Sequence, residues 1–227
     1  MCIVNITQIT DTVHTLNLGN TVSVDEMNLF SLFVKGGFVL IPIVILSLLS
    51  FYLIIQKYLE IRNNVRFDPI MMQTLYNNIK RGDLESAVLN LSPYNSSYAR
   101  VFKRVLRKIG RPVNEIEGSI ESVASIEVTK LGKNLNYLGI ISGIAPMLGF
   151  VGTISGVIKI FYSISLTDNI SIGSISGGLY EKMISSGTGL VVGIIAFTGY
   201  HLLHGKINRF VAKLEEETYS FLELITT

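Results

Sequence analysis

Four side chains that could pass protons stand in or beside long apolar stretches of this sequence. Thr153 lies in the segment APMLGFVGTISG, and Glu181, Ser186 and Thr188 lie in YEKMISSGTGL. A serine or threonine in a membrane helix most often bonds to the carbonyl one turn earlier and does nothing else. Several hydroxyls gathered on two helices favour instead a polar-lined path for ions or protons, which is the chemistry that the sequence suggests.

Three uncharged apolar runs, 38–55, 138–158 and 183–203, supply the helices that would position these side chains. The mean hydropathy of +0.47 and a charged fraction of only 16% make a membrane the expected solvent. Each run can cross about 30 Å of hydrocarbon, where only a helix satisfies every backbone group within the segment. The sequence therefore predicts an all-α integral membrane protein with three transmembrane helices.

Lysine and arginine are concentrated between the first and second runs, so the positive-inside rule places that region in the cytoplasm. The net charge of +2 conceals this asymmetry across the membrane, and the basic bias is a topology signal that predicts no nucleic-acid partner. The segment 27–37 forms either an interfacial amphipathic helix or the ragged start of helix one. The predicted order is periplasmic tail (1–26), interfacial helix (27–37), transmembrane helix 1 (38–61), cytoplasmic helical region (62–133), transmembrane helix 2 (134–162), short periplasmic loop (163–173), transmembrane helix 3 (174–205) and cytoplasmic C-terminal helix (206–227).

The region between the first two runs has helical patterns of its own. The segment GDLESAVLNL predicts a helix with Asp83 as its N-cap. In SYARVFKRVLRKIG a basic face, expected to be solvated with anionic lipid as the alternative, lies opposite an apolar stripe of Val101, Phe102, Val105, Leu106 and Ile109. The stretch VNEIEGSIESVASIEVTKLGKNL leads without a proline break into helix two. Helices two and three are therefore both expected to extend into a cytoplasmic helical bundle.

Small residues on the second and third runs predict close helix packing. Three pairs have the small-xxx-small spacing: Gly139/Gly143, Gly152/Gly156 and Gly189/Gly193. Pro146, Gly149, Thr153 and Gly156 share one face of helix two. Helix one is bulky nearly all round, which suits a lipid-facing helix.

The third run leaves two questions open. Ser186 and Thr188 are about 200° apart on a helix, so both cannot point into one pore. If helix three begins at Met183, Glu181 is an interfacial charge of little consequence. If it begins near Ser174, Glu181 lies at membrane depth, where an ionisable group is costly and usually functional.

Enzyme chemistry has no support in the sequence. It contains no HExxH, GxxxxGK[ST] or GxSxG motif, and Cys2 is the only cysteine. We therefore expect no catalytic residues, no metal site and no cofactor.

The segment IAPMLGFVGTISGVIKIF resembles the helix-two signature of the TolQ/ExbB/MotA proton-channel family, closest to its ExbB/TolQ branch. YEKMISSGTGLVVGIIA resembles the helix-three pattern, and LFVKGGFVLIPIVILS and GDLESAV resemble the start of helix one and the first cytoplasmic helix. This resemblance implies a homopentamer around the single transmembrane helices of an ExbD- or TolR-like dimer, whose aspartate carries the proton, working with a TonB-like protein. The location would be the bacterial inner membrane.

The resemblance also implies roles for individual residues. Thr153 falls on the channel-lining threonine of helix two, Ser186 on the helix-three threonine, and Glu181 on the glutamate before it. Two departures are a serine in place of threonine at Ser186 and Ile195 in place of a helix-three proline. The expected function is a proton-driven motor subunit for TonB-dependent outer-membrane transport, with a TolQ-like envelope role or a structural scaffold as alternatives.

Overall fold

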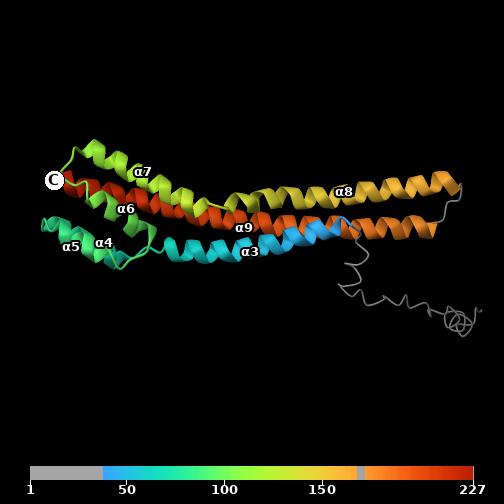
Figure 1. Cartoon of the computed structure of the whole chain (residues 1–227), viewed down its shortest axis with the longest axis horizontal. Coiled ribbons are helices and arrows are strands. Elements are labelled where there is room, and N and C mark those ends of the chain that lie inside the picture. The colour runs from blue at the N-terminus through green and yellow to red at the C-terminus, as the bar shows by residue number, and fades with distance from the viewer. Residues whose placement is uncertain (1–37, 168–171, 227) are drawn as a thin grey trace, which may run out of the picture. The chain divides into compact units, whose positions relative to one another are not determined.

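The computed structural model describes residues 38–167 and 172–226, and within these ranges the regular structure is all helical (Figure 1). The helices are α3 (Leu40–Asn64), α4 (Pro69–Lys80), α5 (Leu84–Leu91), α6 (Ser97–Leu106), α7 (Val113–Gly132), α8 (Leu135–Thr167) and α9 (Ile172–Thr226). Three of them, α3, α8 and α9, are long and apolar enough to cross a membrane. The predicted fold class is thereby confirmed. The predicted tail 1–26 and interfacial helix 27–37 lie outside the described residues.

Helix α9 runs through both parts of the fold, the apolar part that it forms with α3 and α8 and the bundle that contains α4 to α7. Its 55 residues span about 80 Å at a rise of 1.5 Å per residue, whereas a hydrocarbon core is about 30 Å thick. Helices α8 and α3 pack along its first part, and α4 and α7 pack against its C-terminal part (Figure 1). The third long helix therefore extends well beyond its apolar stretch, as predicted.

The short helices α4 to α6 begin at side-chain caps. The Asp68 carboxylate accepts hydrogen bonds from the backbone N–H groups of Ile70 and Met71 at the start of α4. The Asp83 carboxylate accepts one from the N–H of Ser86, which confirms the predicted N-cap of α5. The Ser96 hydroxyl does the same for the first turn of α6. Each cap satisfies donors that a helix start leaves without an intrahelical partner.

The apolar stripe of α6 forms the centre of the core in this part of the fold. Val101, Phe102 and Val105 are completely buried, as the spacing predicted. The Phe102 ring packs against Phe221 of α9, with ring centroids 5.5 Å apart. Burial of large aromatic and aliphatic side chains from water holds this region together.

The expected continuity of helix two is wrong. Helix α7 ends at Gly132, and α8 begins only at Leu135. Between them Lys133 is extended, with a ψ of 134°, and Asn134 is left-handed, with a φ of 66°. Asparagine tolerates this conformation better than most residues, and no proline is needed for such a break. The polar extension of helix two is therefore a separate helix.

Candidate functional site

Helices α8 and α9 approach so closely that glycine alone fits at the centre of the contact. A Cβ atom added to Gly189 would lie 2.5 Å from the Ala145 carbonyl oxygen and 3.2 Å from the Gly149 Cα. A Cβ atom on Gly149 would lie 2.9 Å from the Ser186 Cα. Both distances below 3 Å are to backbone, which cannot move aside as a side chain can. The two backbones therefore touch where the candidate hydroxyls lie.

The other glycines of these helices are not equivalent. A Cβ on Gly193 would meet the Pro146 ring at 2.5 Å, and one on Gly156 would collide with the aliphatic part of Lys182. A Cβ on Gly152 would lie 2.9 Å from the Ser185 Oγ. These positions are all in the α8–α9 contact. Around Gly143, by contrast, the described residues leave open space within 4 Å.

The hydroxyl groups differ in what they bind. Thr153 Oγ1 donates to the Phe150 carbonyl at 2.6 Å, and Thr188 Oγ1 donates to the Ile184 carbonyl at 2.8 Å. Each hydroxyl thus bonds to its own helix. Ser186 is half-buried, and its hydroxyl has no hydrogen-bond partner among the described residues. The Ser186 hydroxyl is consequently available to water or to another chain.

Thr188 and Ser186 point to different sides of α9. Gly199 faces α3, because a Cβ there would lie 2.7 Å from Ile54. Thr188 precedes Gly199 by eleven residues, so the two point in directions about 20° apart. By the same geometry Ser186 points about 140° away from Gly199. Thr188 therefore lies on the α3 side of α9, and Ser186 lies away from it.

Thr153 lies on the same flank as Ser186. On α8, Thr153 follows Pro146 by seven residues, and on α9, Gly193 follows Ser186 by seven residues. Residues at this spacing share a helix face. The contact between Gly193 and Pro146 shows that the two faces adjoin. This flank of α8 and α9, carrying Thr153 and Ser186, is called the hydroxyl flank below.

The hydroxyl flank is open to the outside of the single chain. Thr153 and Ser186 are half-buried. Farther round the same sides of the helices, Phe150 is 62% exposed and Leu190 is 54% exposed. A second chain can therefore reach both hydroxyls without displacing α3.

The position of Glu181 is defined only by its backbone. Helix α9 begins at Ile172, close to the start near Ser174 and well before Met183, so Glu181 lies inside a helix. Its side chain is outside the described residues. Within the described ranges, His, Cys, Asp and Glu side chains form no group of three that could hold a metal ion.

Ser185 is a polar residue that the sequence did not single out from its neighbours. It is completely buried in the α8–α9 contact, and its hydroxyl donates to the Lys182 carbonyl at 2.9 Å. Periodicity could not separate it from Ser186 because the position of α8 around α9 was unknown. The buried face of α9 thus includes Ser185, while Ser186 is at its edge.

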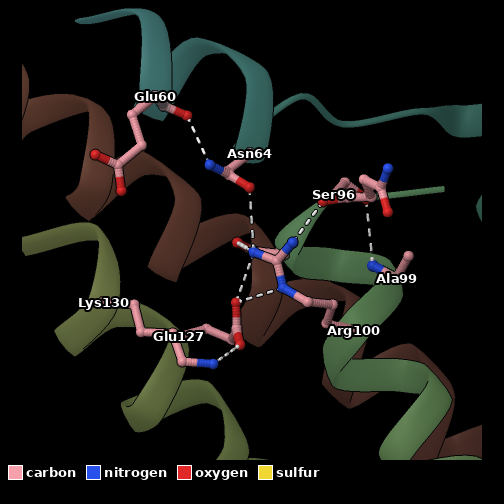
Figure 2. A network of polar contacts seen from close by, with 9 residues as sticks. Glu60, Asn64, Ser96, Ala99, Arg100, Glu127 and Lys130 are labelled. Carbon is pink, nitrogen blue, oxygen red and sulfur yellow. Dashed lines mark hydrogen bonds and ion pairs between the residues drawn. The ribbon is translucent and has the colours of Figure 1, made fainter. Parts of the chain in front are cut away.

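A polar network that the sequence did not reveal joins the ends of three helices (Figure 2). Two nitrogens of the Arg100 guanidinium on α6, Nε and Nη2, lie 2.8 and 2.7 Å from Oε2 of Glu127 on α7. Arg100 Nη2 also donates to the side-chain carbonyl of Asn64 at the end of α3, at 3.3 Å. Lys130 donates to the second oxygen of Glu127 at 2.9 Å. Since Asn64, Arg100 and Glu127 lie far apart in sequence, no local pattern predicted that they would meet.

The surroundings of Glu127 lower the pKa of its carboxyl group. Its side chain is 4% exposed, and burial alone would raise the pKa of the carboxyl. Hydrogen bonds and charge from Arg100 and Lys130 outweigh burial and hold the pKa of Glu127 below its usual range. Glu127 is therefore charged at neutral pH, and the network is an ion pair with full hydrogen bonding.

Comparison with known proteins connects this geometry to a family. The sequence model of the MotA/TolQ/ExbB proton channel family matches residues 94–216, more than half of the chain. The matched stretch includes α8, the hydroxyl flank and most of α9.

Similar individual proteins come from several organisms. The chain is 27% identical over 190 residues to the biopolymer transport protein ExbB-like 3 of Synechocystis, covering 81% of this chain and 88% of that protein. It is 24% identical to an ExbB homolog of Methanothermobacter thermautotrophicus, covering 81% of this chain and 66% of that protein. It is 22% identical to the Tol-Pal system protein TolQ of Haemophilus influenzae, covering 89% of this chain and 93% of that protein.

Proposed function

This chain belongs to the MotA/TolQ/ExbB proton channel family, and we propose that it is the channel subunit of a proton-driven motor in the inner membrane. With an ExbD-like partner it would convert the proton motive force into mechanical work for TonB-dependent outer-membrane transport. It would act without covalent chemistry of its own. The names of the Synechocystis and Methanothermobacter relatives support the ExbB-like assignment.

The hydroxyl flank is the observation that carries the proposal. Thr153 and Ser186 lie on one outward-facing side of the α8–α9 pair, where a close backbone contact fixes both helices. In the proposed assembly several copies surround the partner's transmembrane helix, and this flank faces its carboxylate. The two hydroxyls would then order the water through which a proton reaches the carboxylate. Thr188, on the α3 side, is not part of this lining.

The proposed topology follows the distribution of basic residues. The N-terminus would be periplasmic, and the bundle formed by α4 to α7 with the end of α9 would be cytoplasmic. Glu181 lies in the third turn of α9 from its start and would stand near the periplasmic mouth of the path. A carboxylate at such a site is costly in hydrocarbon and consistent with an ion path.

Substitution of Thr153 tests the proton path directly. Thr153→Val keeps the shape but removes the hydroxyl, so we expect assembly with the partner to survive and proton flux in vesicles to fall by at least about tenfold. Thr198→Val is the matched control, because Thr198 is an exposed threonine on α9 away from the flank. The role of Thr153 would be excluded by a Thr153→Val protein with the same flux as Thr198→Val.

A TolQ-like role in envelope maintenance is the second candidate. The similarity to TolQ of Haemophilus influenzae extends over 93% of that protein, which supports this alternative. Expression in cells that lack either their own ExbB or their own TolQ separates the two roles. Restoration of TonB-dependent uptake alone supports the first proposal, and restoration of detergent resistance alone supports the second.

A structural scaffold without proton flux is the third candidate. The bonds of Thr153 and Thr188 to their own helices support it. Co-expression with a candidate partner, which has one transmembrane helix bearing an aspartate, followed by mass determination in detergent, decides the matter. A complex with that partner supports the motor, whereas a stable assembly that never takes up the partner supports the scaffold.

A further inference from the structure

A pocket of about 680 Å³ lies between the end of α3 and the middle of α9. Four cationic side chains line it: Arg62, Arg66, Lys206 and Arg209. No carboxylate is among its lining residues, and within the described part of the chain none of the four cations forms an ion pair with Asp or Glu. Four like charges that face one pocket repel one another unless an anion occupies it.

The contacts that these cations do make leave most of their donors available. The Lys206 ammonium lies 3.8 Å from the centroid of the Tyr58 ring. Arg209 Nε donates to the Gly205 carbonyl of its own helix at 3.3 Å. Within residues 38–167 and 172–226, the guanidinium groups of Arg62 and Arg66 have no hydrogen-bond partner. Guanidinium groups present paired N–H donors that match the oxygens of a phosphate.

Exposed apolar side chains lead from the predicted membrane segment to this pocket. On α3, Leu59 is 52% exposed and stands three residues before Arg62 on the same helix face, and Arg66 follows just after the end of the helix. On α9, Leu202 is 64% exposed and stands seven residues before Arg209. Apolar surface on both helices thus ends directly at the cluster of positive charge.

We propose that this pocket binds the headgroup phosphate of an anionic phospholipid, whose acyl chains lie along the exposed apolar faces of α3 and α9. Basic pockets between membrane helices at the cytoplasmic surface suit such headgroups. The polar and apolar parts of a phospholipid match the two parts of this surface. The inference requires only that α3 and α9 cross a membrane, and it stands whether or not the protein conducts protons.

The test uses the full chain purified in detergent, with bound lipid counted by native mass spectrometry after addition of phosphatidylglycerol or phosphatidylcholine. We expect retention of phosphatidylglycerol over phosphatidylcholine. Replacing the last arginine of α3 and the one just after the helix, as Arg62→Gln with Arg66→Gln, should weaken phosphatidylglycerol binding roughly 25-fold, about fivefold for each charge removed near the surface. Both side chains are exposed, so the variant is expected to fold.

The matched control removes the same charge elsewhere. Arg104→Gln with Arg107→Gln alters two exposed arginines of the α6 region that do not line the pocket, and it should bind phosphatidylglycerol like the unaltered protein. Equal losses in the two double variants would overturn the site in favour of unspecific charge attraction. Equal binding of the two lipids would also overturn it. Displacement of phosphatidylglycerol by an equal concentration of inorganic phosphate would overturn the proposal of a lipid ligand and indicate a site for a soluble anion.

Discussion

The α8–α9 contact and the α6–α9 contact hold the same long helix by opposite means. In the first, glycines bring two backbones together, and a Cβ on Gly189 would lie 2.5 Å from the Ala145 carbonyl. In the second, the rings of Phe102 and Phe221 pack 5.5 Å apart in a region of bulky buried side chains. One contact depends on the absence of side chains, and the other depends on their size.

The solvent on each side explains this difference. Between helices in lipid there is no hydrophobic driving force, so association depends on close van der Waals contact, which small residues permit. Outside the membrane, removing large apolar surface from water stabilises the fold. Helix α9 is thus held by close backbone contact along its apolar part and by burial of large apolar side chains from water along its polar part. Two substitutions test this contrast, and a third tests the ion pair that supports the bundle.

The largest expected effect is truncation in the water-exposed bundle. Phe102→Ala should lower the free energy of unfolding by about 3–5 kcal/mol, because it removes a completely buried ring and leaves a cavity. Phe161→Ala on α8, where the ring is 66% exposed, is the control and should cost far less. Chemical unfolding in detergent measures both. Equal costs would contradict the idea that burial from water acts mainly in the bundle.

An intermediate effect is expected from adding one methyl group to the α8–α9 contact. Gly189→Ala should destabilise the protein by about 1–3 kcal/mol, since the new Cβ collides with backbone. Gly187→Ala, two residues away, has open space within 4 Å and should be neutral or stabilising, because alanine favours helix more than glycine does. Thermal unfolding of the two variants distinguishes them, and a Gly189→Ala protein as stable as Gly187→Ala would show that the helices can separate at little cost.

The smallest effect concerns the ion pair in the bundle and its dependence on pH. Because the pKa of Glu127 is lower in the folded protein than the ordinary value of 4.5, its contribution is present above that value and is lost as pH falls through the folded pKa. Arg100 is 38% exposed, so solvent screens the pair, and Glu127→Gln should cost only about 1 kcal/mol at neutral pH.

Unfolding curves between neutral and acidic pH measure this contribution. The difference in stability between the unaltered protein and Glu127→Gln should shrink below pH 4.5. Glu115→Gln is the control, because Glu115 is 54% exposed and forms only a surface pair with Arg111. A difference that stays constant with pH would show that Glu127 acts by packing and not by its charge.

Local chemistry in the sequence determined much of this protein. Apolar runs long enough to cross a membrane determined three helices, a carboxylate before a helical pattern determined the cap at Asp83, and the spacing around Phe102 determined a buried face. Each of these features depends only on residues within a few turns of one another, so one sequence is enough to predict it. The break at Asn134 was missed because its left-handed conformation has only a weak sequence preference.

Only the tertiary structure decided which polar residues come together. Periodicity gave a separation of about 200° between Ser186 and Thr188 on an ideal helix, but it could not say where α3 and α8 lie around α9. The contacts at Gly199 and Gly149 place Thr188 beside α3 and leave Ser186 on the flank with Thr153. The pairing of Arg100 with Glu127 is likewise tertiary. A sequence sets the rotation of each side chain about its own helix axis, whereas the position of neighbouring helices depends on packing between segments far apart in the chain.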